Sequence, residues 1–311
     1  MSEEKALYRV TNWEEYNQSL IRRGNMELWF NEEVLEQWAA PATGRRGRPR
    51  QYSDLALQCL LALRLLYHLP LRATQGFFLS LLRLLECPLA VPNYTTLCRR
   101  QGRLEPGLAV TPSQAPRHLL IDSTGLKIFG EGEWKVRMHG KSKRRTWRKL
   151  HLAVDGATQE IVATRLTESS VRDAQVLPSL LLQVDGRIRQ VSADGAYDTW
   201  ECRYVIHTRE AQATIPPRDN GVPAGCPEIP PAAERDQALA DIERDGSKSW
   251  RQQSGYSRRS LAETAMFRVK TTFGEKMRAR LIQNQIAEAV MKSHILNKFI
   301  QEGLPQSEVR K

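Results

Sequence analysis

Apolar positions in the first third of the chain form short segments bounded by residues typical of helix ends. The run Leu55–Leu69 follows a Ser-Asp pair, which favours a helix start, and Pro70 stops it. A second helix is expected over about residues 72–86, and a third begins at Asn93, a good N-cap residue. Three short helices with a basic last one suit a helix-turn-helix, whose candidate DNA contacts are Arg99, Arg100 and Arg103; an ordinary charged surface helix is the alternative.

The pattern changes from His118 onward to apolar runs and to alternation of apolar and polar residues, both typical of strands. The segments 147–154 and 161–166 flank Asp155-Gly156-Ala157-Thr158, which predicts a hairpin. Further strands are expected at residues 118–121, with an extension over 126–129 beyond a Ser-Thr-Gly interruption, and at 188–193 and 213–216.

Helical segments alternate with these strands. One helix is expected at about 173–184, and another to about Arg209, with Asp198 as its cap. Residues 217–250 contain five prolines and mixed charge, which predicts a loop or small insertion. Helical spacing then runs from about Tyr256 to about Ile300, so the pattern indicates a mixed α/β sheet domain.

The charge balance points to a polyanionic partner. The chain has 311 residues, 46 Lys and Arg against 35 Asp and Glu, and a formal charge of +11. The most apolar run, Leu55–Leu69, is shorter than the roughly 20 residues of a membrane span and is interrupted by polar residues. No secretory signal is visible at the N-terminus. We therefore expect a cytoplasmic protein with no membrane partner.

Several common sites have no counterpart in the sequence. Five scattered cysteines without a Cys-x-x-Cys pair argue against a disulfide framework and a zinc site. Glycine-rich nucleotide-binding loops are absent, so no nucleotide cofactor is expected.

Two basic segments are candidates for DNA contact. Eight Lys and Arg residues lie between Lys135 and His151 without an acidic residue, and such a run repels itself unless a polyanion neutralises it. Its candidate contacts are Lys141, Lys143, Arg144, Arg145, Arg148 and Lys149; a solvated face is the alternative. Arg46 and Arg48, in Arg-Gly-Arg-Pro, resemble an AT-hook core that fits a narrow minor groove, although a plain flexible linker explains them equally.

Three acidic residues are the candidate catalytic group. Asp122 and Asp194 each follow an apolar run read as a strand, where side chains commonly project from a sheet into a site. An isolated aspartate at such a place is usually a turn or cap residue. At about 100 degrees per residue, however, Tyr256, Arg259, Glu263 and Lys270 share one stripe of a helix about 60 degrees wide, which would bring Glu263 to the sheet.

The chemistry of this set suits cleavage of phosphodiesters. Three carboxylates can hold two Mg²⁺ ions through hard oxygen ligands, with one ion activating the attacking oxygen and one stabilising the leaving oxygen. Tyr256, Arg259 and Lys270 would extend the acidic site with phosphate contacts. The alternative is a solvated helix face on which Arg259 and Glu263 form an ordinary ion pair.

The spacing Tyr256-x2-Arg259-x3-Glu263-x6-Lys270 resembles the Y-(2)-R-(3)-E-(6)-K signature of DDE transposases, and the chain resembles the insertion-sequence-five family. The contexts Ile121-Asp122-Ser123-Thr124-Gly125-Leu126-Lys127 and Ala193-Asp194-Gly195-Ala196-Tyr197-Asp198 look like that family's two Asp segments. Leu69-Pro70-Leu71-Arg72 and the segment from Pro92 to Leu97 look like its N-terminal region, so the resemblance covers about residues 44–300.

This resemblance implies a ribonuclease-H-like catalytic domain in which Asp122, Asp194 and Glu263 bind two Mg²⁺ ions, for which Mn²⁺ can substitute. The substrates would be the element's terminal inverted repeats and a target duplex, held by a homodimer or higher oligomer. The expected organisation is an N-terminal segment over 1–43, a basic linker and helical DNA-binding domain over 44–112, a catalytic domain over 113–300, and a tail over 301–311.

Two other functions remain open on sequence grounds. One is a DNA-binding regulator without catalysis, against which the three intact carboxylates count. The other is a ribonuclease-H-like nuclease that does not join strands.

Overall fold

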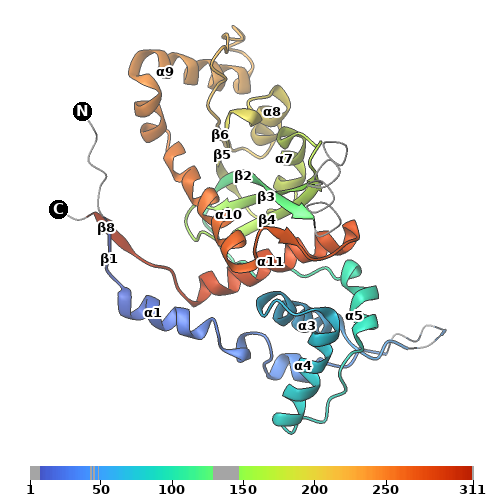
Figure 1. Cartoon of the computed structure of the whole chain (residues 1–311). Helices are drawn as coiled ribbons and strands as arrows, with labels where there is room; N and C mark the ends of the chain where they lie inside the picture. The colour runs from blue at the N-terminus through green and yellow to red at the C-terminus, as the bar shows by residue number, and fades with distance from the viewer. Residues whose placement is uncertain (1–7, 43, 45, 48, 129–146, 310–311) are drawn as a thin grey trace, which may run out of the picture. The chain divides into compact units, whose positions relative to one another are not determined.

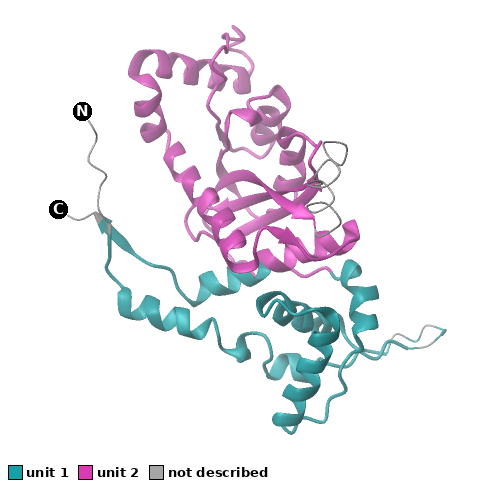
Figure 2. Ribbon diagram, in the orientation of Figure 1, with its two compact units in different colours: residues 1–104, 294–311 teal, residues 105–293 magenta. Residues whose placement is uncertain are grey.

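The computed structural model describes all residues except 1–7, 43, 45, 48, 129–146 and 310–311. Two compact units make up the chain: residues 1–104 with 294–311, and residues 105–293 (Figure 2). The last helix, α11 (Ile282–Glu302), contributes to both.

The first unit is helical. Its elements are β1 (Tyr8–Val10), α1 (Trp13–Arg22), η1 (Met26–Leu28), α2 (Glu32–Glu36), α3 (Asp54–Leu66), α4 (Leu71–Leu84), α5 (Tyr94–Arg100), η2 (Gln101–Arg103) and β8 (Ser307–Val309). The predicted caps are confirmed: Ser53 Oγ accepts the N–H of Ala56 at 3.0 Å, and Asn93 Oδ1 accepts the N–H of Thr95 at 2.9 Å. β1 pairs antiparallel with β8, which joins the two ends of the described chain.

Aromatic residues before the linker build the core of this unit. Trp29, Phe30 and Trp38 are buried, and the Phe30 ring meets Trp38 and Phe78 edge-on. Trp38 also donates its indole N–H to the carbonyl of Ala90 at 2.8 Å. The early segment therefore supplies the apolar surface that covers α3 and α4.

α3 is the buried helix that its apolar run predicted, with nine of its residues buried. Within the described residues no single helix has the length and apolarity to cross a membrane; α3 and α4 meet that standard only together, as a pair bent by 109°.

The second unit is built on a six-stranded mixed sheet (Figure 1). Its strands are β2 (Arg117–Ile128), β3 (Trp147–Asp155), β4 (Ile161–Glu168), β5 (Ile188–Ser192), β6 (Gln212–Thr214) and β7 (Lys276–Met277). The order is β4-β3-β2-β5-β6, with β7 paired to β2. β2, β3 and β4 are antiparallel, whereas β5 and β6 run parallel to β2. This arrangement confirms the expected ribonuclease-H-like mixed sheet.

Alternation along β2 separates two faces of the sheet. Leu119 and Ile121 lie in a core cluster with α7 (Asp173–Leu181) and α8 (Trp200–Thr208). Residues of the opposite parity, Leu120 and Asp122, therefore face the other side, and α10 (Ser260–Phe273) packs against β2 and β3.

Two sequence expectations for this unit were wrong. Residues 217–250 are not only loop, because α9 (Pro230–Gln253) occupies much of the segment, with prolines in its first turn, where their missing N–H costs nothing. The helical stretch from 256 to 300 is also broken. It begins with η4 (Tyr256–Arg259), which leads directly into α10, and α10 ends before Gly274, which has a φ of 78°. The strand β7 then precedes α11.

Candidate active site

Asp122 and Asp194 come from neighbouring parallel strands. Leu120 pairs with Ser192 in the β2–β5 register, so continuing that register two residues brings Asp122 level with Asp194. The sequence placed Asp122 at the end of a strand, but it lies inside the twelve-residue strand β2. The Ser-Thr-Gly segment after it continues the pairing with β3. The two residues therefore lie level on neighbouring strand positions, where β5 has ended and β2 goes on.

Asp194 begins the short turn after β5. Its Oδ1 accepts the N–H of Ala196 at 3.0 Å, and it is the N-cap of η3 (Gly195–Tyr197). The predicted cap of the following helix was wrong: Thr199, not Asp198, accepts the N–H of Cys202 and caps α8. Asp198 is instead buried.

The third carboxylate reaches the sheet from α10. Gly255, with a φ of 74°, turns the chain into η4, and Arg259 and Glu263 then face β2. Arg259 Nη1 donates to Asp122 Oδ2 at 3.0 Å, while its Nη2 forms a short hydrogen bond with Glu263 Oε1. One guanidinium thus links the carboxylate of β2 to that of α10, although the helical wheel assumed one regular helix from residue 256.

The pKa of Asp122 is raised by burial and by the charges of the other two acids. Burial raises the pKa of Asp122, the Ser123 N–H and Arg259 oppose this, and the charges of Asp194 and Glu263 raise the pKa further. Burial also lowers the pKa of Arg259, but Tyr256, Asp122 and Glu263 outweigh it and raise that pKa above its ordinary value. The arginine therefore stays charged beside the acids.

The donor set fits a hard divalent cation, since carboxylate oxygens are the ligands that such ions prefer. Among the described residues, no three His, Cys, Asp or Glu side chains are close enough together to hold one ion. The guanidinium of Arg259 stands between Asp122 and Glu263. A cation held by these carboxylates would compete with that guanidinium for them.

The other residues of the predicted stripe lie beside this cluster. The Tyr256 ring is 5.8 Å from the Arg259 guanidinium and 5.9 Å from that of Arg251. Lys270 is half-buried on α10. With Lys127, which has the larger effect, it lowers the pKa of Glu275 at the start of β7.

The predicted DNA contacts divide into described and undescribed residues. Lys141, Lys143, Arg144, Arg145 and Arg48 lie outside the described residues. Among the described ones, Lys149 bonds Asp173 and Arg148 bonds Gln285, both at 3.0 Å, and Arg100 bonds the carbonyl of Tyr52 at 2.7 Å and Asp54 at 2.5 Å. Arg46, Arg99 and Arg103 are exposed.

Sequence reasoning missed the polar group centred on Asp198, Arg203 and Arg235. Asp198 and Arg203 are joined by an ion pair of 2.9 Å whose side chains are 2% and 1% exposed. The available signal was Arg203 itself, a charged residue between Cys202 and Ile206 on the apolar side of α8, which implies a buried partner.

Two family models match the chain, and both are described as a transposase DDE domain. One matches residues 113–298, more than half of the chain, and the other matches residues 21–131. Among solved structures, the chain is similar to the cryo-EM structure of the piggyBac transposase synaptic complex with hairpin DNA. The identity is 11%, the TM-score is 0.38, and the match covers 92% of this chain and 78% of that chain. At this level of similarity we infer nothing about this chain from that structure.

Proposed function

This chain belongs to the DDE transposase family, the metal-dependent polynucleotidyl transferases of DNA transposition, and we propose that Asp122, Asp194 and Glu263 are the ligands of its divalent ions. The substrates would be the terminal inverted repeats of an insertion sequence and a target duplex. Membership of the insertion-sequence-five family remains a prediction from the spacing of the Tyr-Arg-Glu-Lys stripe.

The observation that carries this proposal is that strand register and one arginine link three acids from distant parts of the chain. Asp122 and Asp194 come level on adjacent strands, and Glu263 shares the Arg259 guanidinium with Asp122. Carboxylates repel one another, so a group of this kind needs cations. We propose two Mg²⁺ ions, for which Mn²⁺ substitutes. When bound, such a pair activates the attacking oxygen and stabilises the leaving oxygen of an in-line displacement.

Arg259 then has two alternative partners. Without metal, its guanidinium neutralises Asp122 and Glu263. With metal in place it is released toward a DNA phosphate, which a guanidinium binds with the same forked geometry. Tyr256, whose ring is 5.8 Å from this guanidinium, and Lys270, in the last turn of α10, would complete the phosphate contacts, so that the residues of this stripe would orient the scissile strand.

DNA recognition would come mainly from the basic segments and the N-terminal helices. The exposed Arg99 and Arg103 are the contacts that we propose for α5 and η2, acting as a helix-turn-helix, whereas Arg100 braces the start of α3. Arg46 and the 141–149 basic run would bind the backbone. Cleavage and joining within one assembly require two ends held together, so we propose at least a dimer on DNA.

The proposal is tested by strand cleavage of a duplex that carries the element's end. Protein with Mg²⁺ should nick the duplex and, given a target plasmid, join the freed 3′-hydroxyl to it. Asp122→Asn, Asp194→Asn and Glu263→Gln should each abolish cleavage and leave duplex affinity unchanged. Retained cleavage in any one of the three rejects the ligand assignment. Cleavage without joining would identify a nuclease, and binding without cleavage by the unmodified protein would identify a regulator.

A further inference from the structure

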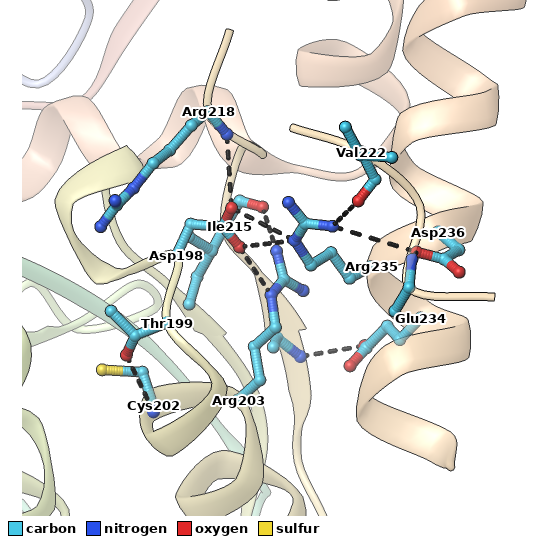
Figure 3. A network of polar contacts seen from close by, with 12 residues as sticks. Asp198, Thr199, Cys202, Arg203, Ile215, Arg218, Val222, Glu234, Arg235 and Asp236 are labelled. Carbon is cyan, nitrogen blue, oxygen red and sulfur yellow. Dashed lines mark hydrogen bonds and ion pairs between the residues drawn. The ribbon is translucent and has the colours of Figure 1, made fainter. Parts of the chain in front are cut away.

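The carboxylate of Asp198 lies buried four residues after Asp194 and is surrounded by donors (Figure 3). Arg203 Nε, on α8, donates to its Oδ1 at 2.9 Å, and Arg235 Nε, on α9, is 3.3 Å from both oxygens. The backbone N–H of Arg218, which follows β6, donates to Oδ2 at 3.3 Å. One carboxylate with a 2% exposed side chain therefore ties together α8, α9 and the segment after β6.

The two arginines are held at their other ends as well. Arg203 Nη2 donates to the carbonyl of Ile215 at 2.9 Å, and Arg235 Nη1 donates to that of Val222 at 2.9 Å. Glu234, next to Arg235 on α9, accepts the N–H of the middle residue of β6 at 3.0 Å. The first turn of α9 is thus fixed to the sheet through side chains, not only through the chain that leads to it.

The backbone between Asp194 and Asp198 is too tight to move at one end alone. The N–H of Tyr197 donates to the carbonyl of Asp194 at 3.1 Å, and the N–H of Asp198 donates to that of Gly195 at 3.2 Å. The Tyr197 side chain is fully buried in the core beneath. A shift of the Asp198 carboxylate is therefore carried through this turn to Asp194.

A buried carboxylate with two guanidiniums adds little net free energy to the stability of a fold, because the cost of desolvation offsets most of the electrostatic attraction. What charged hydrogen bonds supply is direction, since each donor fixes an oxygen to within a narrow range of positions. We infer that Asp198, Arg203 and Arg235 are positioning residues that hold Asp194 level with Asp122, and that Arg235 couples α9 to this site. The inference rests on the proposed role of Asp194 as a metal ligand.

Metal affinity of the DNA-free protein tests this inference. Arg235→Met keeps the aliphatic stem and removes one donor, so Mn²⁺ affinity, measured by the electron paramagnetic resonance of free Mn²⁺, should fall about tenfold; losing an outer partner of a metal ligand commonly costs 10- to 100-fold. Asp198→Asn should fall further along that range. Single-turnover cleavage should slow in parallel, with duplex affinity unchanged within about twofold. Arg235→Lys, which keeps the charge but not the fork, should lie between wild type and Arg235→Met.

Two control variants separate positioning from general effects. Arg244→Met removes an arginine of the same helix whose partners, Asp241 and Asp245, are on α9 itself, and should leave Mn²⁺ affinity unchanged. Arg117→Met breaks a buried pair of 2.5 Å with Asp155 at the start of β2, away from Asp122. It should lower the melting temperature and spare Mn²⁺ affinity.

The outcomes distinguish the inference from its premise. If Arg235→Met, and Asp198→Asn where it folds, melt earlier but bind Mn²⁺ as wild type does below their melting temperatures, the positioning role is overturned. If Asp194→Asn also binds Mn²⁺ like wild type, the ligand assignment itself fails, and this inference fails with it. Loss of affinity in Asp194→Asn and Arg235→Met, with both controls normal, supports the inference.

Discussion

Two carboxylate–arginine clusters of the second unit differ in how far their carboxylates are exposed. In the first, Arg259 joins Asp122 to Glu263, whose side chain is 56% exposed. In the second, Asp198 receives Arg203 and Arg235 with a side chain that is 2% exposed. The groups are the same, but the Glu263 carboxylate is largely open to water and the Asp198 carboxylate is almost sealed from it, although Arg259 and Arg235 are similarly exposed, at 18% and 20%.

The difference decides which cluster can exchange partners. An exposed carboxylate that loses its arginine is rehydrated at little cost, so a metal ion or a phosphate can compete for either group. A sealed carboxylate that loses its arginine stays buried without a counter-charge, which is strongly unfavourable. The open cluster is therefore suited to binding, and the sealed one to holding the backbone in place.

The largest expected difference is in stability. Asp198→Ala should lower the free energy of unfolding by about 3–5 kcal/mol, because it leaves two arginines without their buried partner. Glu263→Ala should change it by about 0.5 kcal/mol or less, as is usual for exposed positions. Urea unfolding of the two variants measures both values. Equal losses would show that the two clusters do not differ in this way.

The next largest effect should come from acid, which acts on two buried histidines. Burial lowers the pKa of His118 and of His151 to about 4, from 6.5 in an unfolded chain. Below pH 6.5 these histidines bind protons in the unfolded chain but stay neutral in the folded chain. The free energy of unfolding therefore falls as the pH drops from 6.5 to 4. Each histidine can contribute up to about 3 kcal/mol of this loss.

Urea midpoints measured across this pH range test the histidine prediction. His151→Gln should flatten the curve, because its ring is fully buried and no described residue hydrogen-bonds its Nδ1, to which Asp173 Oδ1 lies at 3.8 Å. An unchanged slope in that variant would assign the acid sensitivity to other groups.

The smallest expected effect is on metal binding by the open cluster. Arg259→Gln removes the cation that competes for Asp122 and Glu263, so Mn²⁺ affinity of the DNA-free protein should rise about tenfold, or about 1.4 kcal/mol. Arg251→Gln is the matched control, because it removes a neighbouring exposed cation that contacts Tyr256 and no carboxylate of the cluster. Weaker Mn²⁺ binding in Arg259→Gln would show that the arginine supports the metal site instead of competing with it.

Much of the local structure could be predicted because its causes are local. The helix at Ser53, the helix at Asn93 and the β3–β4 hairpin all follow from caps, turns and alternation within a few residues. The prolines of α9 led to the expectation of a loop, because a local signal cannot distinguish the two places where proline is common, loops and the first turn of a helix.

The membership of the candidate site stays a prediction from the sequence, whereas its geometry could not be predicted. Spacing singled out Asp122, Asp194 and Glu263, yet the expected interruption after Asp122 is not there, because β2 keeps its pairing with β3 through the Ser-Thr-Gly segment. Asp198 resembled a helix cap, because an aspartate beside a helix start has the same local signature whether it caps the helix or turns inward. Nothing near it in the chain identifies Arg235 as its partner.

The amino-acid sequence by itself predicted most of the element types, nominated Asp122, Asp194 and Glu263 as candidate ligands, and determined the basic character of the chain, since hydrophobic period, capping and charge are properties of neighbouring residues. The tertiary structure alone decided that Asp122 comes level with Asp194, that Arg259 lies between two acids, and that Asp198 is sealed by α9. These depend on strand register and on burial, which bring together groups far apart in the chain. A buried charge without a partner is also strongly unfavourable, so a buried charged group stays paired with a nearby opposite charge, however distant in sequence that partner is.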